Sequence, residues 1–163
     1  MTGSPMKYID VSEAIDLLGL RLVLTAGVPG PWSEAAKAIF QIKGIEYTAV
    51  RQDGGGENAE LLRWTGQTTA PVAVYNNEAP RCQSLDILFL AERLNPLPAL
   101  IPQDAQQRAT MFGLIREIIG EQGFGWQRRL LMLQPLAQLP AMAEVFNRLA
   151  SKYGYSAAAA EQA

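Results

Sequence analysis

The spacing of apolar residues predicts that the chain begins with a short helix followed by a buried strand. Val11, Ile15 and Leu18 recur at intervals of four and three residues, so in a helix they share one face. After Gly19, the run LRLVLTA has the density of apolar and β-branched side chains that is typical of a buried strand. The glycines and prolines of GVPGP then end this strand.

A second helix, a second strand and a third helix follow. A helix is predicted to start near Ser33, with Pro31 just before it, Glu34 in its first turn and Gly44 just past its end. The run EYTAVRQ predicts the second strand, and the glycines of DGGGEN separate it from a short amphipathic helix, AELLRWTG. The order up to this point, after the leading helix, is strand, helix, strand, helix.

The next segment predicts a hairpin and then a longer helix. In APVAVYNNEAPRCQS, the turn-forming pair Asn76-Asn77 lies between two extended pieces. In SLDILFLAERL, Ser84 suits the N-cap and the apolar residues recur on one side. After the proline-rich connector 95–102, the pattern from Asp104 onward is helical, with interruptions at Gly120, Gly123, Gly125, Pro135 and Pro140.

These elements predict an α/β domain of order βαβαββα, followed by an all-α domain. The first two strands pair through a right-handed crossover and the hairpin adds antiparallel strands, which gives a four-stranded mixed sheet covered by helices. We expect an N-terminal extension at 1–20, the α/β domain at 21–94 and the helical domain at 95–163.

Charge and composition exclude several classes of protein. The chain of 163 residues is 48% hydrophobic, so it can bury a core, and its net charge is only -2. Its basic residues are scattered, which argues against nucleic acid and anionic membranes as partners. One cysteine, Cys82, and no histidine exclude an internal disulfide and histidine acid–base chemistry, and we expect no metal site.

The N-terminal sequence lacks the pattern of a signal peptide. Asp10, Glu13 and Asp16 interrupt its hydrophobic residues, and no basic start precedes a sustained apolar region. Later apolar runs such as LDILFLAERL are too short and too charged to span a bilayer. We therefore expect a cytoplasmic protein.

Three motifs carry a resemblance to a known family. They are the triplet Ala70-Pro71-Val72, the pair Gln83-Ser84 thirteen residues after that proline, and the helix that begins SLDILFLAERL. With the predicted element order, they resemble the thioredoxin-like half of a cytosolic glutathione transferase. The resemblance covers roughly residues 20–120, and it implies further helices, so we interpret the chain as a shortened form with an incomplete helical domain. The alternative is an unusually small member of the family whose exposed helices are covered by a partner.

The resemblance implies a set of residues that bind glutathione. Ala70, before a cis Pro71, is expected to pair through its main chain with the cysteinyl part of the ligand, as in strand addition. Gln83 and Ser84 are expected to hold the γ-glutamyl end at the start of their helix, and Thr69 to add a polar contact. The alternatives are a trans proline that enters an edge strand, and a serine that serves only as N-cap.

The position of the usual catalytic residue holds a glycine. Aligned on the family, Gly30-Pro31-Trp32-Ser33 places Gly30 where relatives have serine or cysteine, so dithiol chemistry is not available there. Candidates for stabilising the glutathione thiolate are the Ser33 hydroxyl, the amides of 32–34 and Thr25. Alternatively, Ser33 caps its own helix. Trp32 either lines the second-substrate pocket or packs on the second domain.

Two functions follow from the resemblance. The first is a glutathione transferase, a homodimer that uses glutathione as co-substrate and joins its thiolate to a small apolar electrophile, as in detoxification. The second is a non-catalytic binding or scaffold protein with the same fold. Gly30 and the short helical half favour the second function, whereas Pro71 with Gln83-Ser84 favours the first.

Overall fold

The structure is a computed structural model that describes residues 6–27, 29–120 and 122–137. The chain divides into two compact units, Met1–Leu100 and Ile101–Ala163, which are described separately below. The helical pattern predicted beyond residue 137, including the interruption at Pro140, lies outside the described residues.

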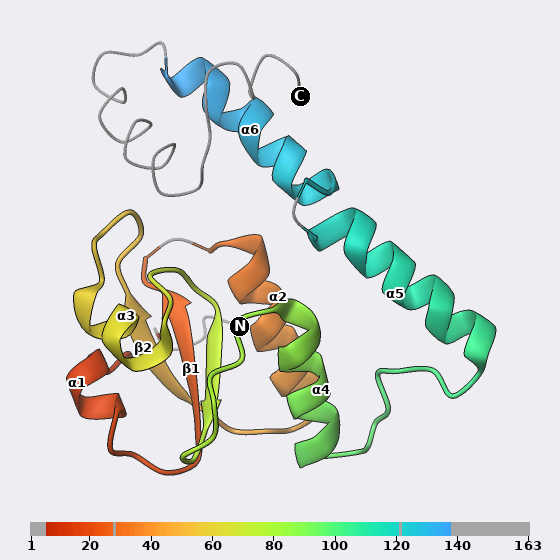
Figure 1. The fold of residues 1–163 in the computed structure, drawn as a ribbon, viewed down its shortest axis with the longest axis horizontal. Coiled ribbons are helices and arrows are strands. Elements are labelled where there is room, and N and C mark those ends of the chain that lie inside the picture. The colour runs from red at the N-terminus through yellow and green to blue at the C-terminus, as the bar shows by residue number, and fades with distance from the viewer. Residues whose placement is uncertain (1–5, 28, 121, 138–163) are drawn as a thin grey trace. The chain divides into compact units, whose positions relative to one another are not determined.

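The first unit contains a three-stranded mixed sheet with helices on both faces (Figure 1). The strand order is β2-β1-β3, in which β1 is parallel to β2 and antiparallel to β3. The parallel pair and the antiparallel third strand are as predicted. The elements are α1 (Val11–Ala14), β1 (Leu20–Thr25), α2 (Pro31–Ile42), β2 (Thr48–Gln52), α3 (Ala59–Thr65), β3 (Val72–Tyr75) and α4 (Ser84–Leu94).

The alternation of side chains along β1 supplies two separate hydrophobic cores. Leu20, Leu22 and Leu24 point to one face, where they pack with apolar residues of α2 and α4. Val23 points to the other face, where it packs with residues of α1 and α3 such as Leu61. All residues of β1 except Thr25 are buried, and the strand is covered on both faces, which is typical of a central strand.

The predicted fourth strand does not form. The chain turns at Asn76, whose φ of 48° is left-handed, but the returning segment makes only one isolated bridge, between Arg81 and Ala73. The two hydrogen bonds of this bridge measure 2.9 and 2.8 Å. Pro80 has no N–H to extend the ladder, and α4 begins only three residues after Arg81. The four-stranded sheet of the prediction is therefore wrong, and the sheet has three strands.

The N-terminal segment is integrated into the first unit. Ile9 forms a parallel bridge with Val50: its N–H donates to the Ala49 carbonyl at 3.0 Å and its carbonyl accepts from the Arg51 N–H at 2.9 Å. This bridge covers part of the outer edge of β2. The segment thus protects an edge that would otherwise present unpaired main-chain groups.

The leading helix is shorter than its apolar pattern predicts. It ends at Ala14, and Ile15 and Leu18 are 41% and 72% exposed rather than on a buried face. Arg21 explains this end, because its guanidinium donates to the carbonyls of Ala14, Ile15 and Leu17, which a longer helix would use internally.

Arg21 is the most unusual core residue of the first unit. Its side chain is 1% exposed, and it also donates to the Asn76 carbonyl and lies 5.4 Å from the centre of the Trp64 ring. Burial lowers the pKa of its guanidinium. Because its partners belong to the segment after α1, the turn after β3 and helix α3, Arg21 ties three parts of the unit to β1.

A buried ion pair lies where α2 and α4 end. The Lys43 ammonium is 2.5 Å from Glu92, and the same carboxylate oxygen accepts from the Leu100 N–H at 2.7 Å. The Lys43 carbonyl in turn accepts from the Asn95 side chain at 2.7 Å. These contacts hold Asn95 and Leu100, two residues of the proline-rich connector, against the ends of α2 and α4.

The second unit contains α5 (Ala105–Ile119) and α6 (Phe124–Ala137). The Asp104 side chain caps α5 by accepting from the Gln107 N–H at 2.8 Å. The predicted break at 120–123 is present, but Gly125 and Pro135 lie inside α6, so the interruptions predicted there are wrong. Across the described ranges, no helix has the length and apolar character needed to cross a membrane.

Candidate functional site

Helix α2 begins just after β1 ends, at the end of the sheet where the parallel strands β1 and β2 have their carboxyl ends (Figure 1). We call this end of the sheet the shared edge. Gly30 is the N-cap, with φ of -83° and ψ of 136°, and Pro31 is the first helical residue. Ser33 is therefore the third residue of the helix, so the predicted N-cap role of Ser33 is wrong. Gly30 takes that role because Pro31 pre-sets the helical backbone angle one residue later.

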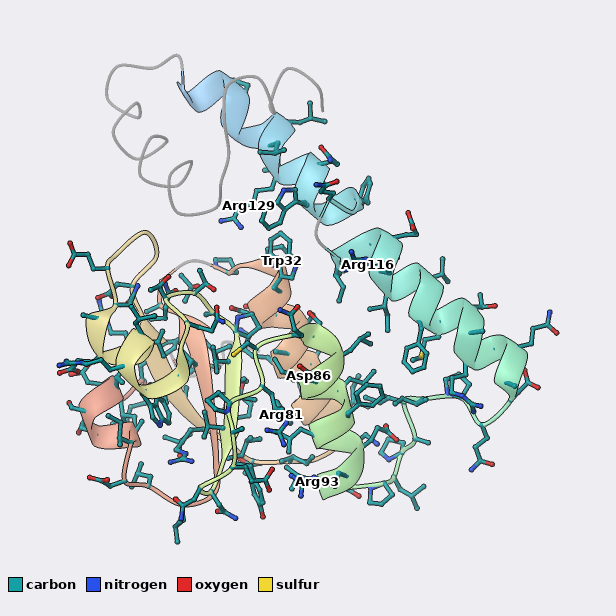
Figure 2. All side chains as sticks on the ribbon, viewed as in Figure 1. Trp32, Arg81, Asp86, Arg93, Arg116 and Arg129 are labelled. Atoms are coloured by element: carbon teal, nitrogen blue, oxygen red, sulfur yellow. The ribbon has the colours of Figure 1, made fainter. Side chains whose placement is uncertain are left out.

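The Ser33 hydroxyl lies in a protected position within the first turn. The residue is only 5% exposed, and among the described residues its hydroxyl has no hydrogen-bond partner. The hydroxyl proton is thus not committed to another part of the helix. Trp32, half-buried, lies beside it at the start of α2 (Figure 2).

The space above Gly30 is open. A Cβ built on Gly30 meets no atom within 4 Å, and the backbone angles of the residue are ones that any amino acid adopts. Neither crowding nor backbone conformation therefore requires glycine at this position. The open space lies directly over the N-terminus of α2.

Thr25 ends β1 beside this helix start, but its hydroxyl is already occupied. It donates at 2.8 Å to the side-chain oxygen of Gln52, the last residue of β2. A hydroxyl has a single proton to donate. Thr25 can therefore donate to a sulfur atom only if it gives up Gln52.

The segment before β3 carries the predicted main-chain site. The Ala70–Pro71 peptide bond is cis, as predicted, and Thr69 and Ala70 are half-buried. Within the described part of the chain, neither the N–H nor the carbonyl of Ala70 has a hydrogen-bond partner. Ala70 thus offers an unpaired donor and acceptor immediately before an edge strand.

Helix α4 starts one residue earlier than predicted. Gln83 is the N-cap and Ser84 the first helical residue, and neither side chain caps the helix, so the N-cap role predicted for Ser84 is wrong. The polar groups of both residues are therefore available to a ligand. Asp86 lies in the same first turn (Figure 2).

The fold brings the elements that carry these residues to one edge of the sheet. Helices α2 and α4 lie side by side and both start at the end of the sheet where β1 ends (Figure 1). The register continues this arrangement, because Val23 pairs with Val72, which places Pro71 and Ala70 beside the end of β1. Two helix N-termini and an unpaired peptide group thus share one edge.

Cys82 is not a reactive thiol in this arrangement. It is half-buried against the core that contains Val72 and Val74. Burial, together with the negative charge of Asp86, raises the pKa of its thiol. A raised pKa leaves less of the nucleophilic thiolate at neutral pH.

Sequence reasoning missed two residues that support the candidate site. Gln52, predicted only as part of a strand, is a buried polar residue beneath the segment that carries Thr69 and Ala70. Asn58, in the glycine-rich loop, hydrogen-bonds to the same segment. The available signal was weak: an amide at the end of a buried strand, and an asparagine before a short helix.

Sequence comparisons identify no relative of the chain. It matches no protein-family model, and it matches no curated protein sequence.

Solved structures do resemble it. The β-etherase LigF from Sphingobium sp. strain SYK-6 matches with a TM-score of 0.60 and 19% identity, over 88% of this chain and 60% of that chain. A Tau class glutathione S-transferase from mango, Mangifera indica, matches with a TM-score of 0.51 and 19% identity, over 73% of this chain and 62% of that chain. A glutathione transferase homologue from Sulfitobacter, solved with bound glutathione, matches with a TM-score of 0.53 and 17% identity, over 89% of this chain and 68% of that chain.

The chain spans only 60–68% of the length of these proteins. The likeness includes a thioredoxin-like α/β unit followed by helices, in the order that the first and second units show here. From its sheet topology and these structural matches, the chain has the fold of the glutathione S-transferases.

Proposed function

We propose that the protein binds glutathione at the shared edge of the first unit and conjugates its thiolate to a small apolar electrophile. The observation that carries this proposal is the meeting of the α2 and α4 starts with the unpaired main chain of Ala70. The likeness to a Sulfitobacter protein that was solved with glutathione supports it.

The central part of the tripeptide pairs with Ala70 in this proposal. A peptide ligand that donates to the carbonyl and accepts from the N–H of Ala70 adds a short strand to an open edge. The pairing also satisfies two half-buried main-chain groups that lack partners among the described residues. Pro71 then leads the chain into β3.

The γ-glutamyl end lies at the start of α4. The first-turn amides and the positive end of the helix dipole favour a carboxylate at this place. Ser84 and Gln83 add side-chain donors that the helix does not use itself, and Thr69 adds a further polar contact beside Ala70.

The sulfur atom lies over the start of α2. Helix-start amides favour an anion, and Ser33 has an uncommitted hydroxyl in the same turn, so Ser33 is the better candidate for thiolate stabilisation. Thr25 is the weaker candidate because its proton is held by Gln52. Trp32 lines the pocket of the electrophile in this proposal, and the working form is a cytoplasmic homodimer.

A second function has its own supporting observation. Gly30 leaves the place of a catalytic side chain open although the backbone requires no glycine there. A protein that binds glutathione without activating its thiol fits this feature. The two functions differ in whether the bound thiol has a lowered pKa.

Replacing Ser84 with alanine tests the binding site. We expect the Ser84→Ala variant to bind glutathione about tenfold more weakly by calorimetry, because a hydrogen bond to a charged group contributes about 1.5–3 kcal/mol. Ser12→Ala, in the first turn of α1 and exposed, is the matched control and should bind as the unaltered protein does. Equal affinities for all three proteins would remove Ser84 from the site.

Replacing Ser33 tests the chemistry separately. In an ultraviolet titration of bound glutathione, we expect Ser33→Ala to raise the pKa of the thiol by about one unit, the size of one lost charge-assisted hydrogen bond. The thiolate would then form only at higher pH. An unchanged pKa would exclude Ser33, and a thiol pKa in the unaltered protein equal to that of free glutathione would favour the non-catalytic function.

A further inference from the structure

Gln52 forms the centre of a buried polar network below the candidate site. Its side chain is 1% exposed and lies at the end of β2. Its oxygen accepts from the Thr25 hydroxyl at 2.8 Å, and its nitrogen donates to the carbonyls of Asp53 at 2.8 Å and Thr68 at 3.2 Å. Both amide donors and the amide oxygen are thus used within the chain.

Asn58 also donates to the Thr68 carbonyl, from the glycine-rich loop that precedes α3. It is the N-cap of α3 in a left-handed conformation, with φ of 49°. The two hydrogens of its nitrogen are shared among three carbonyls, those of Asp53 at 2.9 Å, Gly56 at 2.8 Å and Thr68 at 3.2 Å. Its oxygen accepts from the Asp53 N–H at 3.0 Å. This fixes the glycine-rich loop as well as Thr68.

The carbonyl of Thr68 therefore receives two side-chain amides. We call the Gln52 and Asn58 side chains together with this carbonyl the Thr68 clamp. The carbonyl of Thr68 and the N–H of Thr69 belong to one planar peptide group, so holding the oxygen also sets the direction of the N–H. The next residue along the chain is Ala70.

The described segment between α3 and β3 has no regular secondary structure, and the Thr68 clamp holds its main chain in place. Between α3 and β3, the other hydrogen bonds seen in the described part of the chain lie close to the end of α3, such as that from the Gln67 N–H to the Thr65 hydroxyl at 3.2 Å. Thr69 and Ala70 thus form no hydrogen bonds of their own with any described residue. Their main-chain direction depends on the clamp on one side and on β3 on the other.

We propose that Gln52 and Asn58 are positioning residues that preset the main chain of Thr69 and Ala70 for the peptide ligand. This inference rests on the proposed glutathione site. Strand addition requires the edge to have its extended form before the ligand arrives, because any ordering on binding reduces the affinity. Neither Gln52 nor Asn58 touches the ligand in this account; both act through the Thr68 peptide.

The Gln52→Met variant tests the inference. Methionine keeps the length of the side chain and loses both amide donors. We expect the NMR order parameters of the Thr69 and Ala70 amides to fall from about 0.85, typical of a rigid backbone, to below about 0.6, and the dissociation constant of glutathione to rise about tenfold. Gln67→Met is the matched control, since the described residues give its side chain no hydrogen bond, and should change neither quantity.

The measurements separate a positioning role from a structural one. Lower order parameters with unchanged affinity for glutathione would overturn the inference, as would unchanged order parameters. If Gln52→Met does not fold, Asn58→Gly replaces it, because glycine keeps the left-handed conformation and loses the amide. If the unaltered protein does not bind glutathione, the proposed function is overturned, and with it the ligand part of this inference. If the unaltered protein and the Gln52→Met variant bind glutathione equally well, the inference alone is overturned.

Discussion

A Gly30→Ser variant is expected to bind glutathione with a thiol pKa about one to two units below that in the unaltered protein, because a charge-assisted hydrogen bond contributes about 1.5–3 kcal/mol. A side chain at position 30 meets no atom within 4 Å, and the backbone angles suit an N-cap serine. The introduced serine hydroxyl accepts a hydrogen bond from a first-turn N–H of α2 and donates a hydrogen bond to the glutathione sulfur. The measurement is an ultraviolet pH titration of the thiolate in the complex.

Gly30→Ala is the control for this variant. It adds the same Cβ without a hydroxyl, so the thiol pKa should stay within the error of the unaltered protein. A lower thiol pKa also leaves more thiolate at neutral pH, so the Gly30→Ser variant should conjugate glutathione to an apolar electrophile faster than the unaltered protein does. The Gly30→Ala variant should show no such increase. An equal pKa for the serine and alanine variants would show that the sulfur does not lie over the start of α2.

An Arg21→Met variant is expected to lower the free energy of unfolding by about 3 kcal/mol, since one buried and three half-buried carbonyls lose their donor. The carbonyls belong to Ala14, Ile15, Leu17 and Asn76. Methionine fills much of the same space, so the loss reflects hydrogen bonding more than a cavity. Urea unfolding followed by circular dichroism measures this change.

Arg51→Met gives the matched comparison on the neighbouring strand. Arg51 is exposed and forms a surface ion pair with Asp53 at 2.9 Å, so its replacement should leave the free energy of unfolding unchanged within experimental error. If Arg21→Met changed stability as little as Arg51→Met, the role assigned to Arg21 in holding α1 would be wrong.

The strands and most helices of the first unit could be predicted from the sequence because their signals are local. The apolar and β-branched residues between Leu20 and Thr25, and the glycine and proline residues around Pro31, define a buried strand and a helix start without knowledge of the rest of the chain. The fourth strand was overpredicted. Its pattern is extended, but Pro80 and the early start of α4 leave room for one bridge only.

Long-range contacts account for what the sequence did not predict. The end of α1 at Ala14 depends on Arg21, whose guanidinium takes the carbonyls that follow the helix. A basic residue inside an apolar strand gave no sign of this partner. The role of Gln52 was hidden for the same reason, because its partner Thr68 lies sixteen residues further along the chain.

The candidate site could be predicted in part. The motif around Pro71 and the pair Gln83-Ser84 pointed to segments that the fold brings to one edge. The capping roles of Ser33 and Ser84 were assigned one or more residues away from the observed N-caps. That difference matters chemically, because it leaves both serine side chains uncommitted to capping.

A crystal structure of the protein with glutathione tests the central claim most directly. The account predicts the cysteinyl main chain paired with Ala70, the γ-glutamyl carboxylate at the start of α4, and the sulfur within hydrogen-bond distance of the first turn of α2. An empty edge at millimolar glutathione, or a ligand bound elsewhere, would contradict it.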